Sequence, residues 1–263
     1  MKEISAAAAF DRITAEGPEF LIDADSLCYL IESEKPVTCF EGSDCIMLVS
    51  GESGAEQITV LPFCSTFDVG ALTELLREYD DASIVINVQR LSDECERETE
   101  RLLEKRYVLE KTTKDYMYSA GSLPAAVSPD IRMLDESDGE LFCAMMQEPA
   151  AYRPPLHVLF DVFVARRQGH IAGAFYNGRI VGYLSFNEML PNVFDVDYIY
   201  VVPEMRERGI GRELGSFYAA YAAENGHTAY WSSAKNTASE NTALSCGFRL
   251  VHRDKKYVAA PRG

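Results

Sequence analysis

The sequence predicts an α/β fold with a mixed sheet, built as two similar units, and three observations support that prediction. Segments rich in β-branched and aromatic residues alternate with segments of helical spacing along the 263 residues. At residues 195–226 a strand runs directly into a glycine-bearing turn and a helix. The first half repeats the element order of the second at an offset of 141 residues, which places Pro62 on Pro203 and Gly70 on Gly211. A duplicated unit is therefore expected.

Residues 1–40 have the weakest pattern in the chain. The rest of the N-terminal half has the pattern of alternating strands and helices. Its expected elements are, in chain order, a helix at 20–31, strands at 45–49 and 57–61 joined by a turn at 50–54, a helix at 69–79, a strand at 83–88, a helix that Ser92 caps and that ends at Lys105, and an extended hairpin at 107–118. We expect residues 1–120 to form one domain.

Residues 119–129, SAGSLPAAVSP, are small and proline-rich, and we place a linker at 121–129 and a second domain at 130–263. The expected elements of that domain are a strand at 131–134, a helix at 136–146, a loop at 152–155, a helix at 156–168, a hairpin of 172–176 and 180–187 around Asn177-Gly178, a strand that ends before Pro203, a helix from Glu213 that stops at Gly226, a strand at 228–233, and a short helix before Gly247-Phe248.

The turn at residues 206–212, RERGIGR, predicts a binding site for a phosphate group. Gly209 and Gly211 permit backbone conformations that other residues resist, so consecutive N–H groups can close on an anion. The helix that follows adds the positive end of its dipole. Arg206, Arg208 and Arg212 add positive charge. Because glycine turns before helices are common, this motif alone is a weak signal.

A second motif at a fixed distance makes the signal specific. Asn236-x-x-Ser239 precedes a short helix and then Gly247-Phe248. The pair strand-P-x-x-RxxGxG and N-x-x-S-x7-GF resembles the GNAT superfamily of acyl-CoA-dependent N-acyltransferases, over about residues 130–258. The resemblance implies a GNAT fold in the C-terminal half. Through the repeat, it implies a degenerate GNAT-like unit in the N-terminal half, as in tandem-GNAT proteins.

The resemblance also implies acetyl-CoA as co-substrate and assigns its contacts. The N–H groups of the turn would bind the pyrophosphate, and the edge of the preceding strand would pair with the pantetheine arm as if with another strand. The residues so implied are Arg206, Glu207, Arg208, Gly209, Ile210, Gly211 and Arg212 for the pyrophosphate, Ile199, Tyr200 and Val201 for the arm, Asn236 for a side-chain contact with the arm, and Ser239 as a weaker candidate nearby.

Acetylation of an amine also needs a base, because an amine with a pKa near 10.4 is uncharged in fewer than about one molecule in a thousand at neutral pH. Asp195 is the first candidate, since several family members carry a catalytic glutamate at the matching place on this strand. Asp197, on the same face by period two, and Glu188, at the end of the preceding strand, follow. Many relatives protonate the departing thiolate with a tyrosine, and the matching position here is Ala243, which cannot.

The leading interpretation is an N-acetyltransferase that acts on a primary amine of a small molecule or peptide. Two alternatives stay open: an acyl-CoA-binding regulator without turnover, which the missing tyrosine favours, and a tandem-GNAT acyltransferase of the mycothiol synthase type. Trp231, where some ribosomal-protein acetyltransferases carry an acid, is expected either to line the acceptor pocket or to pack in the core. The sequence identifies neither the acceptor nor the oligomeric state.

Composition narrows the class of protein further. The net charge is −16, and residues 1–120 hold 25 acidic and 11 basic side chains, which argues against a nucleic-acid partner. The longest apolar candidate segment, LHVLFDVFVA, is broken by Asp161, so no membrane association is expected. Seven cysteines show no C-x-x-C and no metal-ligand spacing with the four histidines. We therefore expect reduced thiols, no metal site and a cytoplasmic location.

The N-terminal half lacks the groups that would bind CoA. At the 141-residue offset, RERGIGR corresponds to residues 65–71, STFDVGA, which keeps Gly70, has no arginine and places Asp68 where the phosphate would lie. An acidic side chain there should repel a pyrophosphate. Cys95 stands at the position of Asn236, and Gly54 at that of Asp195. We expect a unit that is retained for packing and does not bind CoA.

Overall fold

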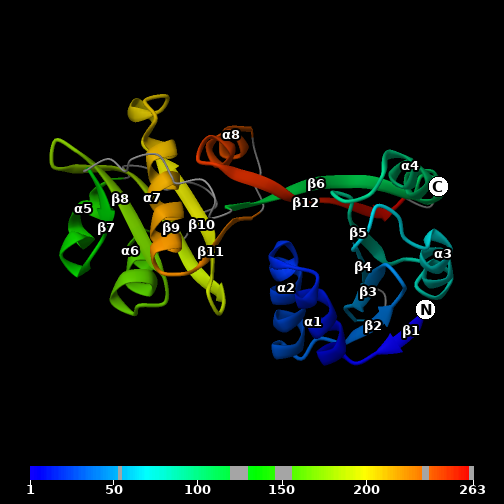
Figure 1. The fold of residues 1–263 in the computed structure, drawn as a ribbon. Coiled ribbons are helices and arrows are strands. Elements are labelled where there is room, and N and C mark those ends of the chain that lie inside the picture. Colours follow the sequence, from blue (N-terminus) through cyan, green and yellow to red (C-terminus); the bar gives the residue numbers. More distant parts are fainter. Residues whose placement is uncertain (53–54, 119–129, 146–155, 233–236, 261–263) are drawn as a thin grey trace. The chain divides into compact units, whose positions relative to one another are not determined.

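The computed structural model describes residues 1–52, 55–118, 130–145, 156–232 and 237–260, in two compact units (Figure 1). The first comprises Met1–Lys114 with Val251–Gly263, and the second comprises Asp115–Leu250. The domains predicted from the sequence, 1–120 and 130–263, differ from these units in the segments 115–120 and 251–263. The predicted linker at 121–129 lies outside the described residues.

The first unit is a sheet with the strand order β1-β2-β3-β4-β5-β12-β6 and helices packed on it. Leu72, Leu75 and Leu76 of α3 fall on one stripe and pack in a core with Ile58 and Ile84 of the parallel pair β4–β5. In chain order its elements are β1 (Lys2–Ile4), α1 (Ala6–Ala15), α2 (Leu21–Glu32), β2 (Val37–Glu41), β3 (Cys45–Ser50), β4 (Gln57–Pro62), α3 (Val69–Glu78), β5 (Ser83–Asn87), α4 (Asp93–Leu103) and β6 (Tyr107–Tyr118).

Three parts of this unit differ from what the sequence predicted. Residues 1–41 contain a helix and two strands that were not expected, α1, β1 and β2. The side chain of Ser5 accepts a hydrogen bond from the N–H of Ala8 and caps α1, which buries Ala9 and Ile13. Residues 107–118 form one long strand and not a hairpin, because no glycine, proline or asparagine interrupts them.

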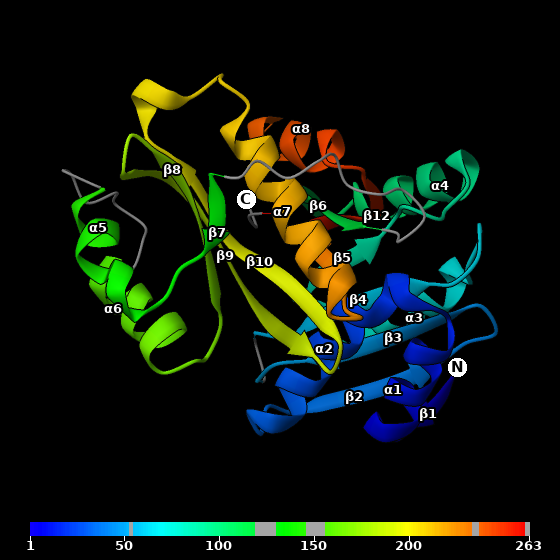
Figure 2. The same cartoon turned by 60° about the vertical axis from the view of Figure 1, so that its left-hand side comes forward.

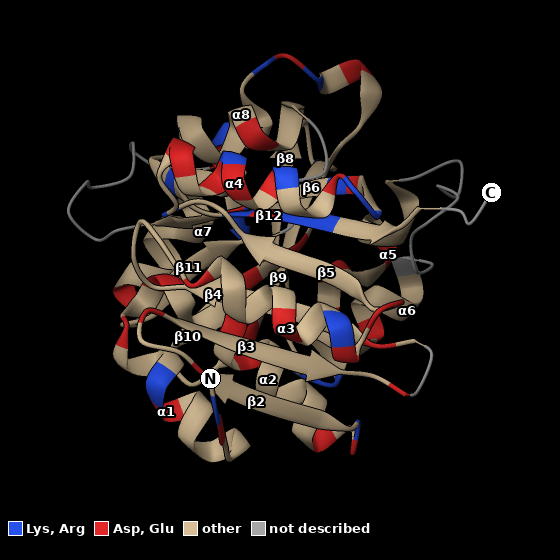
Figure 3. Cartoon of the chain, turned by 90° about the vertical axis from the view of Figure 1, so that its right-hand side faces the viewer, with Lys and Arg blue, Asp and Glu red and all other residues tan. Residues whose placement is uncertain are grey.

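The charged helix α4 has a partner for its acidic face within the first unit. Ser92 caps it by accepting from the N–H of Cys95, as predicted. Glu96 then receives hydrogen bonds from Arg253 (2.8 Å) and Lys255 (2.6 Å) on β12 (Phe248–Ala259). Figure 3 shows the acidic colour on α4 and the basic colour along β12. These ion pairs hold α4 against β12, and the sequence of the helix alone does not indicate them.

The second unit has the strand order β6-β11-β10-β9-β8-β7. Asn177 and Gly178 join β8 to β9 with φ angles of 50° and 72°, which is the two-residue turn that the sequence predicted. In chain order its elements are β7 (Ile131–Met133), α5 (Gly139–Ala144), α6 (Leu156–Phe160), a π-helical turn (Asp161–Ala165), β8 (His170–Tyr176), β9 (Arg179–Leu190), β10 (Val193–Val201), α7 (Ile210–Glu224), β11 (Thr228–Trp231), α8 (Thr237–Ser245) and the start of β12.

Helices cover both faces of the second sheet. Figure 2 shows α7 running across its strands, and Leu214 and Tyr218 of α7 pack in a core with Phe186 of β9. On the opposite face Phe142 of α5 lies 5.1 Å from the ring of Tyr183, also on β9. Side chains on the two faces of β9 thus pack in two separate hydrophobic cores. The sheet is fixed from both sides, and the end of β10 is held in place beside α7.

The element order supports the predicted duplication. Apart from short 3₁₀ and π turns, the described parts of both halves follow the order strand, two helices, three strands, helix, strand, helix, strand. α3 begins at residue 69 and α7 at 210, and the bounds 107–118 of β6 recur at 248–259 in β12, so both pairs keep the 141-residue offset. Residues 254–257 of β12 pair with β5 in the first unit, and residues 116–118 of β6 pair with β11 in the second. Each half of the chain therefore contributes a strand to the sheet of the other unit.

Candidate functional site

A cavity of about 650 Å³ opens in the second unit at the end of β10. The end of β10, the turn that follows it, the first residues of α7 and one face of α8 form its walls. Most of the predicted binding residues line it: Ile199, Tyr200, Val201, Arg206, Glu207, Gly209, Ile210, Gly211, Arg212 and Ser239. Arg208 is not among the lining residues, and Asn236 lies outside the described part of the chain.

The turn leaves the N-terminus of α7 open to an anion. Gly209 is the N-cap of α7 with a φ of 85°, in the left-handed region, and it offers no side chain to cap the helix. The first residue to donate back into the helix is Glu213, whose N–H bonds the carbonyl of Gly209. The N–H groups of Ile210, Gly211 and Arg212 therefore have no acceptor within the helix, and they point toward incoming negative charge.

Gly211 has a different role from the one its motif suggested. Its φ is not in the left-handed region, so the backbone does not require glycine there. A Cβ at this position would lie 3.7 Å from Thr242 and 3.9 Å from Ile199, and both of these residues line the cavity. Gly211 keeps the space between β10 and α8 open, so a large side chain there would fill the cavity.

Arg206 is tied to the end of β10. Its Nε donates to the carbonyl oxygen of Val201 at 3.1 Å, and its guanidinium lies 5.8 Å from the ring centre of Tyr200. The structure holds this positive charge against the end of β10, where Arg206 lines the cavity. Such a fixed cation attracts an anion with less loss of side-chain entropy.

Sequence reasoning missed the polar face of α8. Asn241, Thr242 and Ser245 line the cavity, and they lie at i, i+1 and i+4 of a helix with little amphipathic character. The hydroxyl of Ser239 accepts a hydrogen bond from Nε1 of Trp231 at 3.0 Å. Trp231 itself is buried and packs against Phe248 in the core, which decides between its two predicted roles. Ala243 is also fully buried.

The strands β10 and β11 stop pairing at Asp195. The parallel ladder of β10 and β11 runs through Val193 to Asp195 and ends where Asp195 faces Tyr230. From there to Val201 the described residues give β10 no strand partner on that side, while its other side stays paired with β9. The edge of β10 that faces away from β9 lines the cavity at Ile199, Tyr200 and Val201, and an extended ligand can lie along it.

A β-bulge separates the two candidate aspartates. Across it, Val196 faces Phe186 of β9 and Tyr198 faces Ser185, so Asp197 is the extra residue. As a result Val196 joins the core under α7, whereas Tyr198 packs on the opposite face. The strict alternation that the sequence predicted for this strand, with Asp195 and Asp197 on one face, is interrupted there.

The three candidate bases have different environments. Asp195 is partly buried, and both of its carboxylate oxygens accept hydrogen bonds from Ser232. Burial raises the pKa of Asp195. The side chain of Asp197 is exposed to solvent. The surrounding protein still removes part of its hydration, and this desolvation, followed by the negative charge of Asp195, raises the pKa of Asp197 to about 7. Glu188 accepts from the N–H of Asn192 at the β9–β10 turn. None of these three carboxylates is among the residues that line the cavity.

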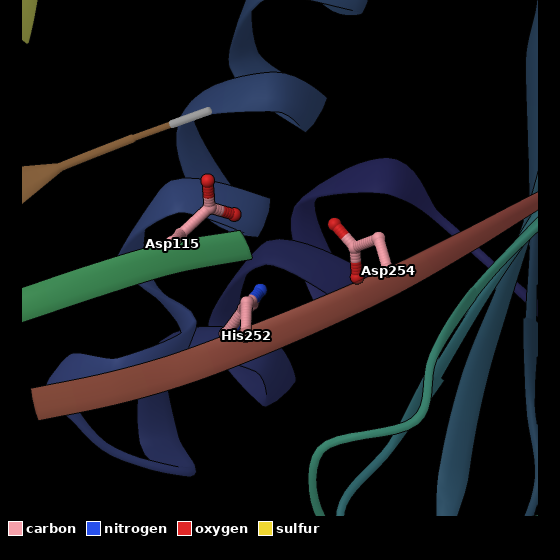
Figure 4. Close-up of side chains that lie close together, drawn as sticks. All are labelled: Asp115, His252 and Asp254. Atoms are coloured by element: carbon pink, nitrogen blue, oxygen red, sulfur yellow. The ribbon is translucent and has the colours of Figure 1, made fainter. Parts of the chain in front are cut away.

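A second set of titratable side chains lies outside the cavity. Figure 4 shows Asp115, His252 and Asp254; the first belongs to the second unit and the other two to the first, and no joint site is assigned to them. Within the first unit, Nε2 of His252 lies 3.3 Å from Oδ2 of Asp23. Burial lowers the pKa of His252 to about 4, so its imidazole is neutral at pH 7.

Comparison with known proteins identifies the second unit. Residues 137–248 match the model of the acetyltransferase (GNAT) family. The chain contains a GNAT acetyltransferase domain. It is accordingly an acyltransferase of the acetyl-CoA-dependent class, as the sequence predicted. A search of curated protein sequences finds no match.

Solved structures show the GNAT fold over most of the chain. A GNAT-family acetyltransferase from Colwellia psychrerythraea is 14% identical, with a TM-score of 0.56 and coverage of 87% of each chain. A GCN5-related N-acetyltransferase from Sphaerobacter thermophilus is also 14% identical, with a TM-score of 0.56 over 97% of this chain and 93% of its own. At this identity the likeness concerns the fold alone.

Among the helices that the structure describes, none combines the length and apolar character needed to cross a membrane.

Proposed function

We propose that the protein transfers an acetyl group from acetyl-CoA to a primary amine of a small molecule or peptide, and that the second unit holds the site. The observation that supports this most strongly is the juxtaposition in one cavity of a helix N-terminus without a side-chain cap, Gly209–Arg212, with the part of β10 at Ile199–Val201 whose edge faces away from β9. The first suits a pyrophosphate and the second suits an amide-bearing arm.

In this proposal the donor contacts follow the walls of the cavity. The N–H groups of Ile210, Gly211 and Arg212 bind the pyrophosphate, with the side chains of Arg206 and Arg212 as cationic neighbours. The pantetheine arm runs along residues 199–201, opposite Asn241 and Thr242 of α8. Those two side chains supply a hydrogen-bonding wall that the amides of the arm can use.

The base is proposed among the three carboxylates, of which the environment supports Asp197 best. A base with a pKa near the working pH is suited to accept a proton from an amine. Asp197 is exposed, whereas both oxygens of Asp195 already accept bonds from Ser232 and Glu188 lies at the far end of the hairpin. The neutral amine then attacks the thioester carbonyl, a C–N bond forms and the C–S bond breaks, and CoA leaves as its thiolate. The proton that the acylated nitrogen loses passes through water to the thiolate, because Ala243 offers no acid.

The test is release of CoA thiol from acetyl-CoA with a panel of amines that includes spermidine, lysine and lysine-containing peptides. We expect thiol release that depends on the amine and yields an acetylated product detectable by mass spectrometry. Wild-type protein that binds acetyl-CoA and releases no thiol with any amine would contradict catalysis and favour an acyl-CoA-binding regulator.

A further inference from the structure

The point where β10 and β11 separate is held by side chains, and nothing in the site described so far uses them. Tyr218 of α7 places its hydroxyl 2.8 Å from the carbonyl oxygen of Phe194 on β10 and 2.8 Å from that of Tyr230 on β11. One residue further along, the N–H and hydroxyl of Ser232 donate to Asp195 at 3.0 and 2.5 Å. We call Tyr218, Asp195 and Ser232 the strand clamp.

The clamp replaces the hydrogen bonds that the ladder loses. The last ladder pair is Asp195 with Tyr230. Tyr218 is fully buried, and burial raises its pKa well above 10, so its hydroxyl stays protonated and shares its one proton between the two carbonyls. The same hydroxyl thus links a carbonyl of β10 to a carbonyl of β11. The clamp therefore fixes how far the strands pair before they diverge toward the cavity.

Asp195 has the contacts of a positioning group. Its Oδ1 accepts from the N–H groups of Val196 and Ser232, and its Oδ2 accepts from the hydroxyl of Ser232. Accepting a proton from a substrate amine would weaken these three bonds, because each of them favours the charged carboxylate. The bond to Val196 also fixes the residue at which the bulge begins.

We propose that Asp195, held by Ser232, is a positioning residue that fixes the bulge residue Asp197 for proton removal from the acceptor amine. This inference rests on the proposed function, and it makes Asp195 and Ser232 positioning residues for the base Asp197. Asp197 is the extra residue of the bulge, so its direction depends on the backbone at Val196. Within the described part of the chain, the titratable groups that interact with Asp197 are Asp195 on its own strand and neutral Tyr218 on α7; its neighbours on β9, Ser185 and Phe186, do not titrate.

The experiment compares five proteins in the same assay: wild type, Ser232→Ala, Ser232→Thr, Asp195→Asn and Asp197→Asn. Its first readout is the pH profile of kcat/KM with acetyl-CoA and the best amine of the panel. Asn at 195 can keep the bonds to both N–H groups, so Asp195→Asn should stay within about tenfold of wild type. Asp197→Asn should lose about 10²–10⁴-fold, the usual size of a general-base effect.

The second readout needs no turnover. In ¹³C NMR of the side-chain carboxyls, the Asp197 signal is identified by its loss in Asp197→Asn. Losing the hydroxyl of Ser232 raises the pKa of Asp195, which reduces its charge, and Asp195→Asn removes that charge entirely. Both variants should therefore lower the titration midpoint of Asp197 by about 0.5–1 unit, since a nearby like charge raises a carboxyl pKa by such amounts. Ser232→Thr, which keeps the hydroxyl, should restore the wild-type midpoint.

Two results would overturn the proposal: an Asp197 midpoint that is the same in wild type, Ser232→Ala and Asp195→Asn, or an inactive Asp195→Asn beside an active Asp197→Asn. If no amine is acetylated by wild type, the proposed function fails, and the NMR readout still decides whether the clamp controls Asp197. If Asp195→Asn does not fold, the Ser232 pair carries the test, because each of those changes removes or keeps a single hydroxyl.

Discussion

Acetyl-CoA should bind at one site per chain, in the second unit, and Gly211→Phe should abolish that binding. A Cβ at Gly211 would already lie 3.7 Å from Thr242 and 3.9 Å from Ile199, so a phenyl ring would occupy the space between β10 and α8. The N–H groups of the α7 N-terminus would remain, but the arm of the ligand could not enter. The change removes the ligand's space and leaves the charges of the turn in place.

The expected size follows from mass action. At a ligand concentration about 100 times Kd, binding stabilises the folded protein by about 2.7 kcal/mol. For a chain of this length that corresponds to a rise in Tm of about 5–10 °C. Wild type should show this rise with acetyl-CoA, and Gly211→Phe should show none. Isothermal titration should give a stoichiometry near one for wild type.

The matched control is Gly70→Phe, the same substitution at the same position of the repeat in the first unit. Gly70 is exposed in the first turn of α3, and like Gly211 its φ lies outside the left-handed region. This control should keep the full ligand-induced shift, and the melting of each ligand-free variant reports any loss of stability. A shift that survives in Gly211→Phe, two equivalent sites, or a CoA photocrosslink within residues 60–95 would refute the assignment.

Two further predictions concern stability. A Cβ at Gly215 would lie 2.6 Å from Sγ of Cys246 and 3.1 Å from the Trp231 ring. Because this overpacks the core, Gly215→Val should lower the free energy of unfolding by about 1–3 kcal/mol. An unchanged urea midpoint would show that the neighbouring side chains can move to make room. The pKa of His252 is about 4 in the folded protein and about 6.5 in the unfolded chain. Below pH 6.5 the unfolded chain therefore binds more protons than the folded protein. The free energy of unfolding should fall between pH 6.5 and pH 4, by up to about 1.4 kcal/mol per pH unit. His252→Gln should flatten this dependence between pH 7 and 5, and equal slopes in the two proteins would exclude the histidine as its source.

The sequence predicted the parts of the site that depend on local chemistry. The left-handed conformation at Gly209 and the presence of a helix after the turn follow from residue types within one turn, although α7 begins at Ile210 and not at Glu213, where the sequence predicted its helical residues. The end of β10 before Pro203 follows from the missing N–H of proline. Local rules suffice there because each feature is decided by neighbours along the chain.

The parts that the sequence did not predict depend on residues far apart in the chain. Ser232 meets Asp195 across 37 positions, and only the pairing of β10 with β11 brings them together. The bulge at Asp197 is a mismatch between two strands, so the alternation of one strand cannot show it. The cavity wall of α8 was missed because a helix of mixed polarity does not indicate which face it turns toward a ligand.

The two units of the repeat differ in the residue that caps the helix after their fourth strand, and this residue decides whether the helix N-terminus is open to an anion. Position 68 in the first unit corresponds to position 209 in the second, and both are N-caps of the helix after the fourth strand of the repeat. At 68 an aspartate accepts the N–H of Ala71 at 3.1 Å, so the helix N-terminus is satisfied by its own carboxylate. At 209 a glycine leaves the equivalent groups open. Because a carboxylate cap stabilises its helix by about 1 kcal/mol, whereas an open N-terminus gains only when an external anion binds, the first unit has the arrangement expected of a structural unit and the second that of a binding unit.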